Sequence, residues 1–412
     1  MQLNDAARLT RRVARAFAPD SPSRIGVAVS GGGDSMALLH LAHAASQAGG
    51  PQVLAVTVDH GLRPEAAAEC AVVAKACAGL GVSHTTLEWR DWDGHGNLQA
   101  AARVARYRLI RDWAAQHDVA GVLLGHTMDD VAETYLMRLG RKAGVDGLAM
   151  MDQSFSKDGL RWARPLTHVG RTELREYLTG QAVQWVEDPS NDDVEFDRVR
   201  VRQALGHLHD LGVTAASLHH ASHTARQARD ALDHYTALEA NRWVASDRGD
   251  LVMPRNPDIP AEMLRRIKSK ALQWLGGLEY PPRQSSLTHL ETGLALDGRA
   301  TVAGCLVSVE GDTLRMTREA NAVKMLITPT DQIWDNRWAF DGPHDAGLTI
   351  RLLGDGIRHC ADWRESGLPR PSLMASPAVW RDDALIAAPL AGEMNGWSVR
   401  MTADFHSSLV TH

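Results

Sequence analysis

The sequence has little of what marks secreted, membrane-spanning and metal-cluster proteins. Its 412 residues include four cysteines, Cys70, Cys77, Cys305 and Cys360, which form no CxxC pair and no metal-spaced quartet. No apolar run approaches the roughly 18 residues of a membrane-spanning helix. Arginines interrupt the apolar residues of the segment 1–17, so we do not expect a signal peptide there. These absences predict a protein of the reducing cytoplasm with no membrane segment.

The chain also lacks an excess of positive charge. Its formal net charge of −6 argues against a general polyanion binder, but local basic patches are what matter for nucleic-acid binding. Basic residues do cluster in three places: Arg161, Arg164, Arg171 and Arg175; Arg198, Arg200 and Arg202; and Arg265, Arg266, Lys268 and Lys270.

The sequence also has no internal repeats and no low-complexity tract. Its 412 residues are more than one domain with a single hydrophobic core usually contains, so we expect two or three domains. Strand-like and helix-like runs alternate over the first 125 residues, which predicts an α/β domain at 1–210 with a doubly wound, mostly parallel sheet. A long helical run at 215–245 and a β-hairpin at 300–317 predict a small, mainly helical domain at 211–320. Short strand-like runs between glycines and prolines predict a small α+β domain at 321–412.

The most informative segment is VAVSGGGDSMALL, residues 27–39. A β-branched run meets a triple glycine flanked by hydroxyls, and a helix-forming run follows at once. Glycines allow successive N–H groups to approach an anion, and a helix start adds unpaired N–H groups and partial positive charge. The turn therefore predicts a phosphate site, although the GKS or GKT ending of the commoner phosphate loop is missing. Its residues are Ser30, Gly31, Gly32, Gly33, Asp34 and Ser35.

Two further polar segments follow predicted strands. Asp59 comes just after the second strand, and GHTMDDVAETYL starts at the end of the fourth. Helical spacing places His126, Asp130 and Glu133 close together, with Asp129 in the first turn. Acidic residues there could merely complement the helix dipole, which explains one carboxylate better than three. Because carboxyl ends of parallel strands share one edge, we expect a phosphate cradle beside a group of carboxylates.

The order of these motifs resembles that of the tRNA(Ile)-lysidine synthetase family, within the N-type ATP pyrophosphatases. The resemblance is carried by SGGGDS, DHGLRPEA, N-x-Q-x-x-A-R-x-x-R-Y, GHTMDDVAET, RKAGVDGLAMM, RPL-x₄-R-x-E-L-x-x-Y and WVEDPSNDD-x₂-F-x-R, with weaker likeness at WDNRW and SPAVWRDDALIAAPL. It is dense to about residue 202 and thin from 210 to 330. One departure is Val199, where the family usually has asparagine.

The resemblance implies ligation of free L-lysine to C2 of the wobble cytidine of CAU-anticodon tRNA(Ile), with ATP as co-substrate and Mg²⁺ as cofactor. It implies ATP binding by the turn residues 30–35 with Asp59 and His126, and catalysis by Asp34, Asp130 and Glu133. Asp34 and Asp130 are the expected metal ligands. The expected tRNA or phosphate contacts are Arg106, Arg198, Arg200 and Arg202, although an exposed helix face is an equal interpretation of Arg106.

Three alternatives remain open. A tRNA-thiolating relative commonly needs cysteines for sulfur transfer or an iron–sulfur cluster, and the CxxC is missing. An ATP-dependent amidotransferase or small-molecule ligase is the second, but no glutaminase segment is visible. A catalytically silent tRNA-binding protein is the third, and the intact Asp34, Asp130 and Glu133 argue against it. The oligomeric state is undecided, with a homodimer as one option.

Overall fold

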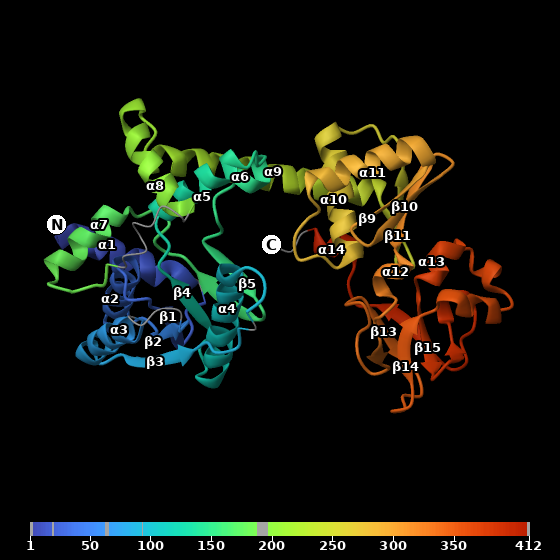
Figure 1. Cartoon of the computed structure of the whole chain (residues 1–412), viewed down its shortest axis with the longest axis horizontal. Coiled ribbons are helices and arrows are strands. Elements are labelled where there is room, and N and C mark those ends of the chain that lie inside the picture. Colours follow the sequence, from blue (N-terminus) through green and yellow to red (C-terminus); the bar gives the residue numbers. More distant parts are fainter. Residues whose placement is uncertain (1–2, 19, 62–65, 93, 188–196, 410–412) are drawn as a thin grey trace. The chain divides into compact units, whose positions relative to one another are not determined.

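The computed structural model describes residues 3–18, 20–61, 66–92, 94–187 and 197–409. It divides into two compact units, Met1–Arg229 and Asp230–His412, which are described separately below (Figure 1). Parts of two quoted motifs, at 62–65 and 188–196, lie outside the described residues. The three domain ranges given above stay a prediction.

The first unit is built on a six-stranded sheet in the order β3-β2-β1-β4-β6-β5. The five strands from β3 to β6 pair in parallel, and β5 adds an antiparallel edge. In sequence order the strands are β1 (Arg24–Ala28), β2 (Gln52–Asp59), β3 (Ser83–Glu88), β4 (Gly121–Leu124), β5 (Ser154–Lys157) and β6 (Leu160–Ala163). The predicted doubly wound, mostly parallel sheet is confirmed.

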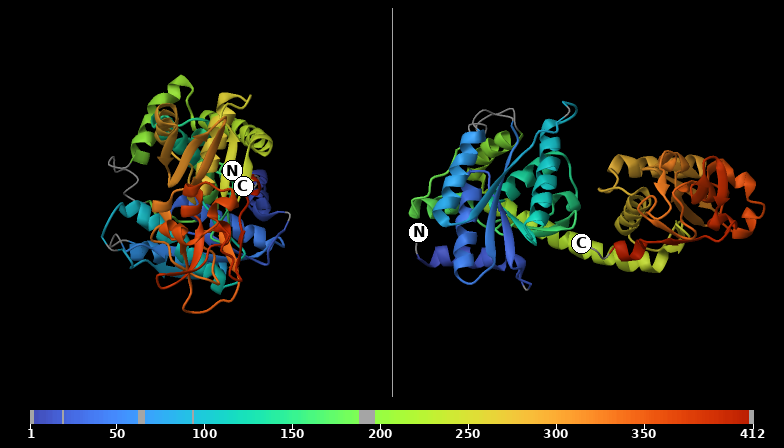
Figure 2. Two further views of the ribbon diagram at one scale, coloured as in Figure 1. Left: turned by 90° about the vertical axis from the view of Figure 1, so that its right-hand side faces the viewer. Right: turned by 90° about the horizontal axis from the view of Figure 1, so that it is seen from below.

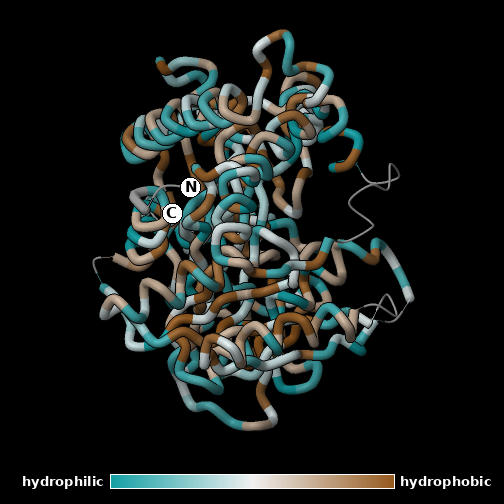
Figure 3. The backbone as a smooth tube through the Cα atoms, turned by 90° about the vertical axis from the view of Figure 1, so that its left-hand side faces the viewer, coloured by the Kyte–Doolittle hydropathy of each residue, from teal (hydrophilic) through white to brown (hydrophobic). Residues whose placement is uncertain are grey.

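Helices cover both faces of this sheet, as the right-hand view of Figure 2 shows. One face packs on α2 (Gly33–Gln47), which contacts α1 (Leu3–Ala14) and α7 (Arg171–Gly180), and α3 (Ala66–Leu80) packs against β2 and β3. The other face packs on α4 (Leu98–Gln116), where Trp113 and Trp162 are fully buried. Along the tube of Figure 3, hydrophobic segments follow the strands, while the helices alternate between hydrophobic and hydrophilic residues. Strands covered on both faces are hydrophobic throughout, whereas each covering helix needs only one hydrophobic face.

The remaining helices of this unit carry the candidate site and the link to the second unit. They are α5 (Met128–Gly140), α6 (Val145–Leu148), α8 (Asp197–Leu208) and α9 (Ala215–Trp243). Helix α5 contacts α8. Helix α9 confirms the long helix predicted from residue 215, and its start is fixed to the first unit by the Met150 N–H, which donates to the Ser222 carbonyl at 3.0 Å.

The second unit begins with an antiparallel sheet in the order β7-β8-β11-β10-β9. Its strands are β7 (Ala245–Asp247), β8 (Asp250–Pro254), β9 (Arg299–Val302), β10 (Cys305–Glu310) and β11 (Thr313–Arg318), and it packs with α10 (Ala261–Gly276) and α11 (Gln284–Asp297). The predicted hairpin is present as β10 and β11. Its first run is divided, because Ala303 and Gly304 turn the chain with φ of 56° and 70°.

The end of the chain forms smaller sheets around the buried Trp334, Trp338 and Trp397. The elements are α12 (Ala320–Val323), β12 (Thr328–Pro329), β13 (Trp338–Asp341), β14 (Thr349–Leu352), α13 (Arg370–Met374), β15 (Pro377–Arg381), β16 (Ala384–Ala387), β17 (Ser398–Met401) and α14 (Phe405–Ser408). Among the described residues, no helix is both long and apolar enough to cross a membrane.

Candidate active site

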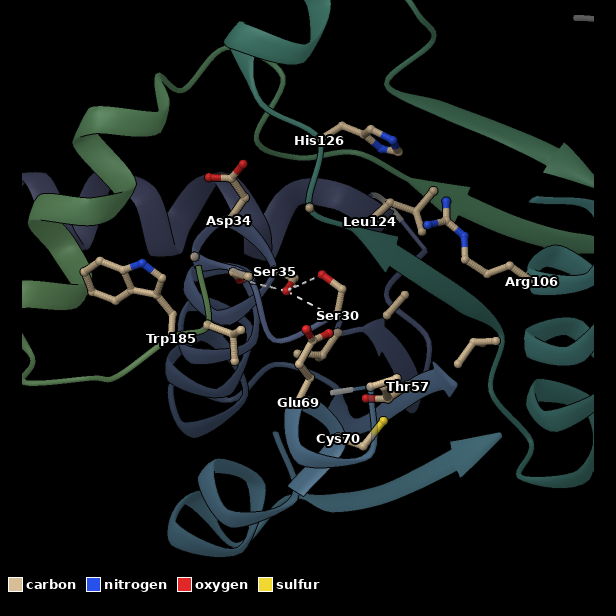
Figure 4. A pocket seen from close by; sticks show the side chains of 18 of the residues that line it. Ser30, Asp34, Ser35, Thr57, Glu69, Cys70, Arg106, Leu124, His126 and Trp185 are labelled. Carbon is tan, nitrogen blue, oxygen red and sulfur yellow. Dashed lines mark hydrogen bonds between the residues drawn. The ribbon is translucent and has the colours of Figure 1, made fainter. Parts of the chain in front are cut away.

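The glycine turn leaves β1 and runs directly into α2. Gly31 has φ of +89°, a conformation that side-chain-bearing residues rarely adopt, and Gly32 is the N-cap of α2 without a side-chain cap. The Ser35 hydroxyl accepts from the Ser30 N–H at 3.1 Å and donates to the Gly32 carbonyl at 2.9 Å (Figure 4). The serines therefore hold the turn in shape, while the first N–H groups of α2 remain available for an anion.

A second segment runs along this turn. The Val186 N–H donates to the Gly31 carbonyl at 2.9 Å. Trp185, labelled in Figure 4, lies beside Gly33. A Cβ on Gly33 would lie 3.4 Å from the Trp185 ring. The start of the WVEDPSN motif is thus a wall of the phosphate turn, more than 150 residues further along the chain.

The turn opens into a cavity of about 1110 Å³ at the carboxyl ends of β1, β2 and β4. Most of the predicted site residues line it: Ser30, Gly32, Gly33, Asp34, Ser35, Asp59, Arg106, His126, Asp130, Arg198 and Arg202. Gly31, Glu133 and Arg200 do not line it. Arg200 instead pairs with the exposed Asp197.

Helix α5 presents its carboxylates through a capping box. The Thr127 hydroxyl caps the N–H of Asp130, and Asp130 Oδ2 accepts from the Thr127 N–H at 2.8 Å and from its hydroxyl at 3.0 Å. Both hydrogen bonds that Asp130 Oδ2 accepts thus come from the helix cap. The other oxygen, Oδ1, lies 3.7 Å from Arg198 Nη1. Asp129 has a different role, because its Oδ2 accepts from the Arg171 N–H at 2.7 Å and so holds the start of α7.

Arg171 joins the phosphate turn to the α5 carboxylates. Its Nε donates to Asp34 Oδ2 at 3.1 Å, and its Nη1 donates to Glu133 Oε1 at 3.4 Å. Its Nη2 lies 3.9 Å from Asp130 Oδ1. One guanidinium thus holds together three carboxylates that come from two helices.

Glu133 is the most deeply buried of these carboxylates, with 1% of its side chain exposed. Its Oε1 accepts from both Arg171 and Arg202, the latter at 3.1 Å. Its Oε2 is buried and has no hydrogen-bond partner among the described residues. A buried carboxylate oxygen without a donor is costly, so this atom can accept a further hydrogen bond at a gain in free energy.

The electrostatics of the site separate these acids. Burial raises the pKa of Asp34, the negative charges of Asp130 and Asp129 add to this, and Arg171 offsets part of it. Burial also opposes ionisation of Asp130, but the hydrogen bond from the Thr127 N–H and the guanidiniums of Arg171 and Arg198 favour the carboxylate, and its pKa is lowered. Burial lowers the pKa of His126 to about 3, so its imidazole is neutral near pH 7.

The carboxylates are suited to Mg²⁺ that is bound together with a nucleotide, and less suited to hold a metal ion with protein ligands alone. In the described part of the chain, no group of three or more histidine, cysteine or acidic side chains is arranged to hold a metal ion. Mg²⁺ commonly takes one or two carboxylates and completes its shell with phosphate oxygens and water. Burial is the main cause of the raised pKa of Asp34, and the negative charge of Asp130 adds a smaller part, which a cation beside the two carboxylates would relieve.

Three contributors to the site were not predicted from the sequence. Arg171 is, in the sequence, one member of an arginine cluster, although it stands in a motif that carries the resemblance. Trp185 begins another such motif. Gly125 lies against the start of α2, where a Cβ would be 3.1 Å from Ser35 Cα. The motifs were the available signal, but only the fold brings these residues to the turn.

The parallel sheet, the phosphate turn after its first strand and the carboxylates at the neighbouring strand end define an ATP pyrophosphatase of the PP-loop class. The model of the PP-loop domain accordingly matches residues 6–208. A tRNA(Ile)-lysidine synthase of Ruegeria pomeroyi is 44% identical over 402 residues, covering 96% of both chains. One from Bradyrhizobium is 37% identical over 74% of this chain and 92% of its own. The chain belongs to the tRNA(Ile)-lysidine synthase family.

Proposed function

We propose that this protein ligates free L-lysine to C2 of the wobble cytidine of a CAU-anticodon tRNA(Ile), with conversion of ATP to AMP and pyrophosphate. The observation that carries this proposal is the single cavity in which the phosphate turn meets Asp34, Asp130 and the arginines that surround them. The reaction needs a triphosphate cradle, carboxylates for a metal and an amine, and cations for RNA phosphates. The turn, Asp34, Asp130 and the arginines line this cavity, and Glu133 lies behind it, bound to Arg171 and Arg202. The cytoplasm, where ATP, lysine and tRNA meet, is its proposed location.

The first half-reaction activates the base. The cytidine O2 attacks the α-phosphorus of ATP, a P–O bond forms, and the bond to the β-phosphate oxygen breaks to release pyrophosphate. The N–H groups of the turn at residues 31–33 and the hydroxyls of Ser30 and Ser35 are the proposed cradle. Asp59 and the neutral His126 complete the proposed ATP site. Asp34 and Asp130 are the proposed ligands for Mg²⁺, which when bound neutralises charge on the departing pyrophosphate.

The second half-reaction replaces the activated oxygen. The ε-amine of lysine attacks C2, a C–N bond forms, and the C2–O2 bond breaks with AMP as the leaving group. The amine must first lose a proton, since the reference pKa of lysine is about 10.4. The unpartnered Glu133 Oε2 supports Glu133 as the acceptor that binds the ammonium. Asp130 Oδ1 is the alternative proton acceptor, because its other oxygen is committed to the capping box.

The RNA contacts are proposed among the arginines of the cavity. Arg106, Arg198 and Arg202 line it, which supports them as contacts for phosphates of a splayed anticodon loop. Arg200 is the weaker candidate because it faces Asp197. Residues 211–320 and 321–412 are proposed to contact the tRNA body and to reject methionine tRNA, which shares the CAU anticodon. A homodimer stays one option for the oligomeric state.

The thiolation alternative is not supported by the cavity. Cys70 is the cysteine among its described lining residues, and burial raises the pKa of this thiol, which makes it a poorer nucleophile. The four cysteines include no pair with CxxC spacing that could hold a cluster with it.

The test is AMP release by the purified protein with ATP, Mg²⁺, lysine and an unmodified CAU-anticodon tRNA(Ile) transcript, with each omitted in turn. We expect tRNA-dependent AMP formation, and radiolabelled lysine in the RNA only when all four are present. AMP release at the same rate with and without tRNA and lysine would overturn the substrate assignment. Absence of AMP under every condition, with tRNA still bound, would favour the silent binding protein. Asp130→Asn and Glu133→Gln then separate the roles, since we expect Glu133→Gln to raise the KM for lysine most.

A further inference from the structure

A second cavity of the first unit is lined by arginines. It has a volume of about 490 Å³ and shares no lining residue with the active-site cavity. Its walls come from α1, from the following turn η1 (Arg15–Phe17), and from β5, β6 and the residues after β6. We call it the arginine groove and define it by six lining residues: Arg8, Arg11, Arg12, Arg15, Arg161 and Arg164.

The positive charge of the arginine groove is largely uncompensated. Glu173 pairs with Arg8, and Arg164 donates to the Asp152 carbonyl at 2.6 Å. Arg11, Arg12, Arg15 and Arg161 form no ion pair with any residue that the structure describes. None of the described residues that line the groove is a carboxylate. A chain of net charge −6 therefore gathers six guanidiniums in one concave place, against the repulsion among them.

Packing fixes part of the groove. The helix arginines recur at spacings of three and four, so they share one face of the α1 segment, while Leu9 and Val13 are buried on another. The Arg161 guanidinium lies over the Phe17 ring at 5.2 Å, and that of Arg164 lies over Phe155 at 4.2 Å. Burial, together with the charge of the neighbouring Arg8, lowers the pKa of Arg12. Arg161 and Arg164, whose guanidiniums these rings hold in place, therefore lose less entropy when an anion binds.

The shape and charge select an extended polyanion. From Arg8 to Arg15 the helical segment rises about 10 Å, which is long enough to meet more than one phosphate of a nucleic-acid strand. A single small anion would occupy two or three guanidiniums and leave the others uncompensated. We propose that the arginine groove binds the sugar–phosphate backbone of the tRNA substrate at a site separate from the cavity that receives the cytidine. This inference rests on the proposed function, because it takes its polyanion from that reaction.

The test uses the full chain with Arg11 and Arg15, which are both exposed, changed to glutamine together. The matched control is Lys75→Gln with Arg108→Gln, which removes two exposed positive charges that line neither cavity. Affinity for the tRNA(Ile) transcript is measured by filter binding over a range of salt concentrations. We expect the groove variant to bind about tenfold more weakly at 0.1 M salt and to lose about one to two from the slope of log K against log salt. The control should change neither by a comparable amount.

Turnover separates this site from the catalytic one. For the groove variant we expect the KM for tRNA to rise, with kcat at saturating tRNA and the KM for ATP as in the unaltered protein. Equal affinity and salt slope in groove variant, control and unaltered protein would overturn the groove while leaving lysidine formation intact, and would favour an acidic protein as its partner. Failure of the unaltered protein to bind tRNA or form lysidine would overturn the proposed function itself, and the groove proposal with it.

Discussion

Arg171 is the residue on which the arrangement of the site depends most. Replacing it with methionine keeps much of the side-chain volume but leaves Asp34 and Glu133 without their shared guanidinium. Breaking a largely buried ion pair from one side costs several kcal/mol, so we expect Arg171→Met to lower the free energy of unfolding by about 2–4 kcal/mol. We also expect AMP formation to fall about 10- to 100-fold, because the carboxylates move apart. Urea unfolding and AMP release measure the two effects.

The control for Arg171 lies four residues further along the same helix. Arg175 pairs with Glu187, and more than half of both side chains is exposed. Exposed pairs contribute about 0–1 kcal/mol, so Arg175→Met should leave the free energy of unfolding nearly unchanged. A similar loss of stability in both variants would show that Arg171 acts as a general surface cation.

His168 makes stability depend on pH. Burial lowers its pKa to about 4, with the nearby charges of His219, Arg12 and His223 acting in the same direction. Gln153 Nε2 lies 2.5 Å from its Nε2, and the His219 ring meets it edge-on at 4.5 Å.

The folded state therefore binds fewer protons at this histidine than the unfolded state between about pH 4 and 6.5, and stability rises with pH across that window. We expect the free energy of unfolding to fall on acidification from pH 6.5 to 4. In His168→Gln, the change in the free energy of unfolding between pH 4 and 6.5 should be smaller by about 1–3 kcal/mol. Denaturant unfolding of both proteins at several pH values measures it, and parallel curves would contradict the assignment.

At the scale of elements, the close approach of β4 to the start of α2 fixes the phosphate turn. A Cβ on Gly125 would lie 3.1–3.3 Å from backbone atoms of Asp34 and Ser35, and backbone cannot swing away as a side chain does. We expect Gly125→Ala to raise the KM for ATP and to cost about 1–3 kcal/mol of stability. Gly140→Ala, at the end of α5 with nothing within 4 Å of the added methyl, is the matched control and should be neutral or slightly stabilising. AMP release and urea unfolding distinguish the two, and equal behaviour would mean that the contact is easily relieved.

The phosphate turn and the strand before it could be predicted because their signals are local. The run from Val27 through Gly33 to Asp34 specifies strand, turn and helix within about ten residues, and the structure follows it. Arg171 and Trp185 could not be placed in the same way, since their partners lie 137 and about 150 residues away in the chain. The position of Arg200 depends on helix rotation, because one step of about 100° decides whether a side chain faces the cavity or Asp197. The expected strand at 300–309 is interrupted at Ala303, whose φ is positive, and an alanine in the sequence gives no sign of such a turn.

For the whole molecule, the two units have separate hydrophobic cores. The clusters around β1 to β6 draw only on residues up to 185, and those of the second unit only on residues from 237 onward. Residues that share one hydrophobic core unfold together, so we expect each unit to have its own unfolding transition. Substitutions in one core should then leave the transition of the other in place.

Ser372 offers the reporter for the second unit. Its hydroxyl donates to Asp250 Oδ2 at 2.6 Å, and Arg315 Nη1 donates to the same oxygen at 2.9 Å. Burial raises the pKa of Asp250, and these donors work against that rise, so loss of the hydroxyl leaves a buried carboxyl less satisfied. Ser372→Ala should cost about 1–3 kcal/mol and lower one calorimetric transition by about 2–10 °C. Arg171→Met should lower the other transition, and ATP with Mg²⁺ should raise only that second one. A single transition that moves with both substitutions would show instead that α9 couples the two cores into one folding unit.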